Sequence, residues 1–140
     1  LVTLQEKLKM EIKKISDKFF EGGAIIEAKY KDQDLTSLNK KKIINIFEKK
    51  GVIIFRGFKI IPNKLTYFTD LFTYRYANDA ARRTKMFKNK NIKSVDLGNA
   101  EMALHSEASF SPSWPEILWF CCIKAPKKSG FTTSNKDCRN

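Results

Sequence analysis

The sequence predicts one domain of mixed α and β structure, in which helices and strands alternate at first and strands follow near the end. Apolar residues recur at helical spacing in three segments, and short β-branched or apolar runs lie between and after them. With 140 residues and 42% hydrophobic residues, the chain can bury one core and is too short for two.

The first predicted element is a helix over residues 1–22. Its apolar residues are spaced by four, four, three and four positions, which places them on one helical face, and Gly22-Gly23 ends the helix. These residues are Leu4, Leu8, Ile12, Ile15 and Phe19.

Residues 23–74 are predicted to continue as strand, helix, strand and helix. Ala24–Tyr30 is the first strand. Thr36 or Ser37 caps the following helix, and Gly51 closes it in a left-handed conformation. The run Val52–Phe55 has the β-branched composition of a buried strand.

After Pro62, Asn63 is expected to cap another helix, whose apolar side includes Leu65, Phe68, Leu71 and Phe72. Residues 75–100 show no useful periodicity and are predicted to form a long surface loop, either a lid over a site or simply flexible. Residues 101–140 return to strand signals, first around Leu104–Ala108 and then over Glu116–Lys124. The apolar stretch inside the second run lacks alternation, which predicts a strand covered on both faces.

The formal net charge is +12, which by itself would suggest an anionic partner. However, only five of the 27 basic residues are arginine, the residue best suited to phosphate and base-edge recognition. Scattered lysines among many Asn, Ile and Phe residues favour a solvated surface over nucleic-acid binding. We therefore expect neither a nucleic-acid nor a membrane partner, and apolar runs such as Ile117–Ile123 are too short to cross a bilayer.

Cys121, Cys122 and Cys138 form an odd set without an apolar leader, which indicates a reducing cytoplasm. Adjacent cysteines in a strand point to opposite faces, so a bridge between Cys121 and Cys122 is not expected. All three are interpreted as packing thiols.

His105-Ser106-Glu107 is the candidate metal motif. In a strand, residues two apart share a face, so His105 and Glu107 can meet one metal ion while Ser106 points away. An imidazole and a carboxylate are two of the three ligands of a facial triad that binds non-haem Fe(II). Alone, such a triplet is weak evidence, because a His beside a Glu is commonly a hydrogen-bonded pair.

The motif has a recognisable context. Six short motifs follow one another along the chain. In order, they are Val52-Ile53-Ile54-Phe55-Arg56-Gly57-Phe58, His105-Ser106-Glu107, Trp114-Pro115, Ala125-Pro126, Ser129-Gly130-Phe131-Thr132 and Asp137-Cys138-Arg139. This order resembles the taurine dioxygenase family of Fe(II)- and 2-oxoglutarate-dependent oxygenases. It looks most like the SyrP-like and clavaminate synthase-like branch, where the carboxylate ligand is Glu. The resemblance extends from about Ala24 to the end of the chain.

The resemblance implies an α+β double-stranded β-helix, or jelly-roll, in which His105 and Glu107 bind Fe(II) and Thr132 contacts 2-oxoglutarate. By its position alone, Thr132 could equally be an ordinary turn residue. Ser129 replaces the usual first glycine of its pair, and we expect the turn to tolerate it. The implied reaction uses O2 to hydroxylate or otherwise oxidise a small molecule such as an amino acid or small acid. Because Glu107 is present, the halogenase variant of this chemistry is not expected.

His105 is the single histidine of the chain, so a second histidine ligand is missing, as is the arginine that would bind the far carboxylate of 2-oxoglutarate. We therefore expect these 140 residues to be the N-terminal portion of one oxygenase domain, incomplete and inactive alone, and the sequence leaves a homo-oligomer open. The alternative is a non-catalytic remnant or truncated metal-binding jelly-roll domain.

Overall fold

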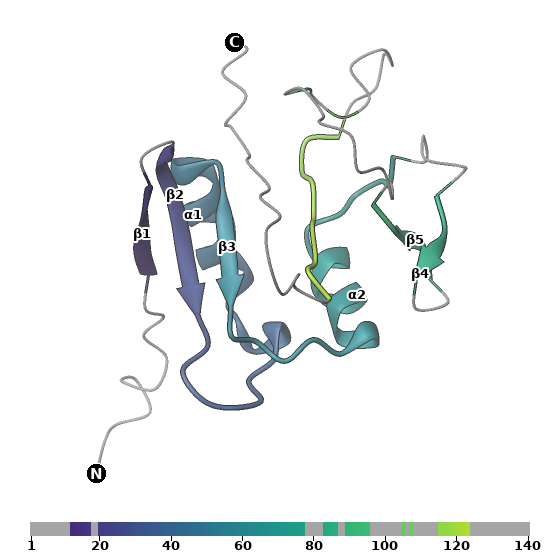
Figure 1. Ribbon diagram of the computed structural model, residues 1–140, viewed down its shortest axis with the longest axis horizontal. Helices are drawn as coiled ribbons and strands as arrows, with labels where there is room; N and C mark the ends of the chain where they lie inside the picture. The colour runs from purple at the N-terminus through teal and green to yellow at the C-terminus, as the bar shows by residue number, and fades with distance from the viewer. Residues whose placement is uncertain are drawn as a thin grey trace, which may run out of the picture. The chain divides into compact units, whose positions relative to one another are not determined.

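The computed structural model describes residues 12–17, 20–77, 83–86, 89–95, 105, 107 and 115–123, and Figure 1 shows their helices and strands. The chain divides into two compact units, Leu1–Phe68 and Thr69–Asn140. The described residues contain both helices and strands, which confirms a mixed α and β composition. They do not contain the two facing sheets of a jelly-roll, so that part of the prediction remains untested.

A three-stranded sheet forms the centre of the first unit. Strand β1 (Ile12–Asp17) pairs antiparallel with β2 (Phe20–Glu27), and β2 pairs in parallel with β3 (Ile53–Arg56). The strand order is β1-β2-β3, with β2 in the middle (Figure 1). A parallel pair cannot be joined by a tight turn, so the chain between β2 and β3 must cross over, and it does so through a helix.

Helix α1 (Lys40–Lys50) is this crossover, and it packs against β2 and β3. Asn39 caps it by accepting a hydrogen bond from the backbone N–H of Lys42 at 3.1 Å. Gly51 ends it with φ 73°, as predicted from the sequence. The predicted cap was Thr36 or Ser37, which instead belong to a separate short 3-10 helix, η2 (Leu35–Ser37).

The core of the first unit lies between the sheet and its helices. Ala24 and Ile26 of β2 are almost fully buried and share one face of the sheet, because they are two residues apart. Ile43 of α1 and Phe68 of α2 (Pro62–Asp70) are also buried. The rings of Phe55 and Phe68 meet edge to face, with centroids 5.5 Å apart, which is an arrangement that aromatic pairs favour.

Helix α2 begins at Pro62, two residues before the Lys64 start that a cap at Asn63 implies, and the missing N–H of Pro62 is harmless in a first helical turn. Asn63 therefore lies inside the helix and does not cap it. The predicted strand Val52–Phe55 is confirmed with a shift of one residue, as β3. Its residues alternate between half-buried and exposed, so it is not covered on both faces.

The predicted leading helix over residues 1–22 is wrong where the structure describes it. Residues 12–17 form β1, and Gly22-Gly23 lie inside β2 instead of ending a helix. The physical reason is pairing: Ile12 lies opposite Ile26, and the ladder along β2 satisfies backbone groups that a helix would satisfy internally. The remainder of that prediction lies outside the described residues.

The second unit contains an antiparallel hairpin of β4 (Lys85–Met86) and β5 (Asn89–Lys93). The backbone N–H of Ser94 donates to the carbonyl of Thr84 at 2.8 Å and extends the pairing past both strands. Residues 75–100 were predicted to be a loop without regular structure, and this was wrong for the hairpin. The short strands carry mostly Lys and Asn, so sequence alternation gave no signal for them.

The predicted strand Glu116–Lys124 is not formed over the described residues 115–123. Leu118, Phe120 and Ile123 are 48%, 70% and 57% exposed, so this run is not covered on both faces. A strand requires a neighbour for its backbone groups, and no described residue pairs with this run. The ring of Trp119 does pack on Phe72, with centroids 5.5 Å apart.

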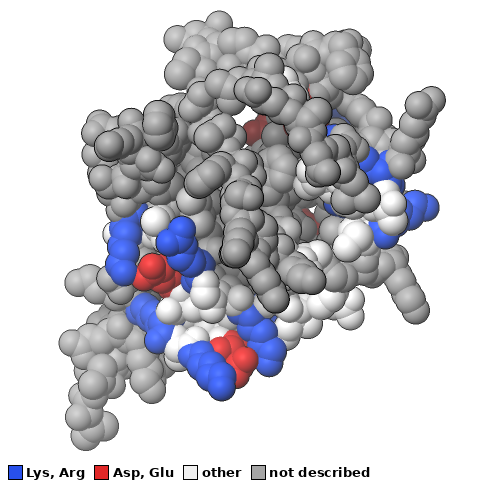
Figure 2. Space-filling view, viewed as in Figure 1, with Lys and Arg blue, Asp and Glu red and all other residues white. Residues whose placement is uncertain are grey.

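The charged surface carries both signs. On the face shown in Figure 2, several basic side chains stand directly beside acidic ones. Three of the described lysines form ion pairs with carboxylates: Lys13 with Glu27, Lys59 with Asp32, and Lys64 with Asp34. No helix among the described residues is long and apolar enough to cross a membrane.

Asp34 provides a prediction about stability and pH. Its carboxylate accepts from Lys64 Nζ at 2.6 Å and from the Thr36 backbone N–H at 2.9 Å, and the first of these contacts is the main reason that the pKa of Asp34 is lowered. A carboxyl group whose pKa is lower in the folded than in the unfolded state stabilises the fold at pH values above its unfolded-state pKa. This stabilisation is lost as the pH falls through the folded-state pKa. Asp34→Asn should therefore reduce the unfolding free energy at pH 7 and have a smaller effect in strong acid, measured by urea denaturation. Equal losses at both pH values would contradict this account.

Candidate metal centre

The two predicted metal ligands lie in the second unit, in an irregular part of the chain. His105 is exposed and has no regular secondary structure, and Glu107 lies in a turn and is partly buried. The predicted strand around Leu104–Ala108 is therefore not formed at either described position. Neither residue belongs to a described strand, so strand pairing does not impose the shared face on which the prediction rested.

Glu107 forms an ion pair that the sequence analysis missed. Its Oε1 lies 3.9 Å from Arg83 Nη2, and both side chains are about one-third exposed. Such a long, partly solvated pair contributes little to stability, about 0–1 kcal/mol. Arg83 directly precedes Thr84 and β4, so the pair connects the metal motif to the base of the hairpin. No sequence signal distinguished Arg83 from its neighbour Arg82.

The chemistry of these two donors suits Fe(II), which binds imidazole nitrogen and carboxylate oxygen. Their number is insufficient, because a catalytic non-haem iron site takes three protein ligands. Among the residues that the structure describes, no group of three or more His, Cys, Asp or Glu side chains could hold a metal ion. His105 and Glu107 are therefore of the donor type that suits the metal, and they are fewer than such a site requires.

Thr132, the candidate contact to 2-oxoglutarate, lies outside the described residues, as do Ser106 and Ser129. The cysteines differ in part from their prediction as packing thiols. Cys121 and Cys122 are free and exposed, and Cys138 is outside the described residues. Although Cys121 is exposed overall, partial desolvation and the adjacent Cys122 raise the pKa of its thiol. Its sulfur is therefore a poorer nucleophile and metal ligand than that of a fully solvated cysteine.

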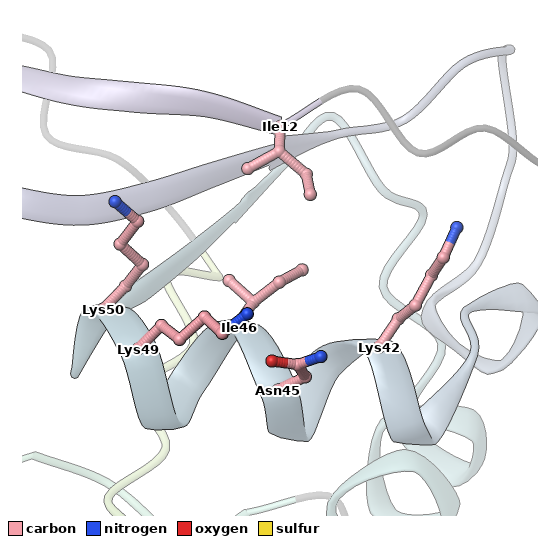
Figure 3. A pocket seen from close by; sticks show the side chains of 6 residues that line it. All are labelled: Ile12, Lys42, Asn45, Ile46, Lys49 and Lys50. Carbon is pink, nitrogen blue, oxygen red and sulfur yellow. The ribbon is translucent and has the colours of Figure 1, made fainter.

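The first unit contains a hollow that the sequence analysis also missed. It has a volume of about 340 Å³, between one face of α1 and the beginning of β1 (Figure 3). Its helical lining residues are spaced by three, one, three and one positions, a pattern that marks one helical face and could have been found in the sequence. The six lining residues are Ile12, Lys42, Asn45, Ile46, Lys49 and Lys50.

Comparison with protein families identifies the class of this chain. Residues 11–134 match the model of the taurine catabolism dioxygenase TauD, TfdA family. The match covers most of the chain and includes His105 and Glu107, so the chain belongs to this family. Members of the family are non-haem Fe(II)- and 2-oxoglutarate-dependent dioxygenases. No curated protein and no solved structure matches the chain significantly.

The metal motif gives a direct prediction. In the full-length protein, His105→Ala or Glu107→Ala should weaken Fe(II) binding by at least about tenfold, because even loss of a residue that only supports a ligand costs about 10–100-fold. Ser106→Ala is the matched control and should bind nearly as well as the wild type. Binding can be measured by titration with Co(II), whose absorption reports its ligands. Unchanged affinity after His105→Ala would remove His105 from the metal site.

Proposed function

We propose that this chain supplies part of the active site of an Fe(II)- and 2-oxoglutarate-dependent dioxygenase that oxidises a small organic molecule. The observation that carries the proposal is the family match over residues 11–134, in which an imidazole and a carboxylate stand two residues apart. The SyrP-like and clavaminate synthase-like branch, a jelly-roll fold and a cytoplasmic location belong to the same proposal. An amino acid or small acid is the proposed substrate class, and assembly into a homo-oligomer is left open by this proposal.

Each proposed site residue has a separate task. His105 and Glu107 hold the metal by nitrogen and oxygen, and Thr132 contacts 2-oxoglutarate. Bound iron, with 2-oxoglutarate and O2, supplies the oxidising chemistry. Arg83 lies beside Glu107, with its Nη2 3.9 Å from Glu107 Oε1. A third metal ligand and an arginine for the far carboxylate of 2-oxoglutarate complete this arrangement in the proposed enzyme.

A second candidate function is a non-catalytic domain that retains part of a metal site. Two observations favour it: His105 is the single histidine in the chain, and the described residues offer no group of three metal donors. The two candidates differ in one measurable property, because only the dioxygenase converts 2-oxoglutarate to succinate in step with substrate oxidation.

The test compares the 140-residue chain with the full-length protein. With Fe(II), 2-oxoglutarate, O2 and ascorbate, we expect the full-length protein to form succinate and the 140 residues alone to form none above background. Two donors and no second histidine leave the short chain with weak metal binding. Succinate formation by the short chain at the full-length rate would show that other side chains complete the site. Absence of succinate from both, across amino acids and small acids, would favour the non-catalytic candidate.

The segment from Arg75 to Asp96 gives a further prediction. If it acts as a lid, its amides should exchange faster with solvent before 2-oxoglutarate and substrate bind than afterwards, because closing lids exclude water. The Ser94 amide is expected to be protected in both states by its bond to Thr84. Hydrogen exchange followed by mass spectrometry measures this. Equal exchange with and without ligands, when binding is shown independently, would leave a plain surface segment.

A further inference from the structure

The hollow beside α1 combines an apolar floor with a basic rim. Ile12 from β1 and Ile46 from α1 face each other across it (Figure 3). Lys42 stands at one end of the helical face, and Lys49 and Lys50 stand toward the other end. The aliphatic stems of lysine extend the apolar surface while their ammonium groups remain in water. The site therefore offers hydrocarbon contact in its middle and positive charge around it.

The three rim lysines are not neutralised within the described part of the chain. The ion pairs found there involve other basic residues, and none of the described residues that line the hollow is acidic. The nearby Lys13 differs, because its Nζ forms an ion pair with Glu27 Oε2 at 2.6 Å. Three like charges around one small hollow repel each other, and an anion bound there would relieve that repulsion.

The position of Lys42 strengthens this argument. It lies in the first turn of α1, where the helix dipole is positive, and that turn contains no acidic residue. Lysine is unfavourable there for helix stability. A residue that violates a local stability rule without a compensating contact in the fold is a candidate for a functional role.

We propose that this hollow binds a small amphipathic carboxylate, whose short hydrocarbon chain lies between Ile12 and Ile46 and whose carboxylate meets the rim lysines. The volume of about 340 Å³ falls at the lower end of the range for small-molecule sites, roughly 300–1,000 Å³. Lys42 and Lys50 are about 12 Å apart along the helix axis, so an anionic group at either end of a short chain can reach a lysine. Asn45 supplies an amide for an additional hydrogen bond.

Charge and shape together favour this class of ligand over others. An inorganic anion would use the lysines and leave the isoleucines without a function. A neutral or cationic hydrocarbon would use the isoleucines and meet unfavourable charge. A nucleic acid would require a basic surface that follows its backbone, whereas these lysines surround a single apolar hollow. This proposal rests on residues of the first unit and does not depend on the metal centre.

The experiment uses octanoate as the probe and the isotope-labelled chain, with amide resonances followed by NMR. Octanoate should shift the resonances of α1 and the beginning of β1, while octylammonium and inorganic phosphate should not. Replacing all three rim lysines by glutamine should weaken octanoate binding by roughly fivefold or more, as expected for loss of exposed charge pairs. Ile12→Ser, at a half-exposed position, should also weaken it. Lys85→Gln on β4 is the matched control and should have no effect.

Several results would overturn the proposal. Equal binding of phosphate would mean that the lysines bind any anion, and equal binding of octylammonium would mean that hydrocarbon contact alone decides. Shifts of the α1 resonances with protein concentration, without probe, would show that a second copy of the chain covers the hollow. Unchanged octanoate affinity in both the triple-lysine variant and Ile12→Ser, with folding confirmed by circular dichroism, would place the ligand elsewhere.

Discussion

The parallel pairing of β2 with β3 is the constraint on which the first unit depends. Because the two strands run in the same direction, the chain must cross one face of the sheet between them, and α1 occupies that crossover. The crossover brings Ile43 over the sheet, where Ala24 and Ile26 are buried. Cross-strand register places Ile26 beside Phe55, and Phe55 in turn contacts Phe68 of α2. This pairing thus accounts for the buried face of α1, and Phe55 links the sheet to Phe68 of α2.

Elements whose signals are local were predicted well. Gly51 is an example, because a left-handed helix end strongly favours glycine and the run of β-branched residues follows directly. Helix α1 and strand β3 therefore appeared nearly where expected. The cap was misplaced because Asp34, Thr36, Ser37 and Asn39 are all good capping residues within a few positions. Asp34 caps the short η2 helix, and Asn39 caps α1.

Elements that depend on distant pairing were predicted poorly. Ile12 and Ile15 fit a helical face, yet residues 12–17 form β1 because β2 offers a paired edge there. The opposite error occurred at Glu116–Lys124, where strand-like composition is not accompanied by a pairing partner among the described residues. In the first case a partner overrides helical spacing, and in the second its absence leaves strong β propensity without a strand. Neither outcome can be read from the segment itself.

The candidate metal centre has the same dependence. His105 and Glu107 could be proposed as donors from the sequence, because they stand two residues apart in a recognisable order of motifs, and their role as metal ligands stays a prediction. Their geometry could not be predicted, because two residues of this spacing share a strand face only if a neighbouring strand holds the segment extended. In the described chain Glu107 lies in a turn beside Arg83. Convergence of the two side chains through a shared strand face therefore requires strand pairing around residues 105–107. The helical side of the hollow beside α1 needs no such pairing, since helical spacing alone brings Lys42, Asn45, Ile46 and Lys49 to one face. Ile12, on the other side of the hollow, is held there by the pairing of β1 with β2.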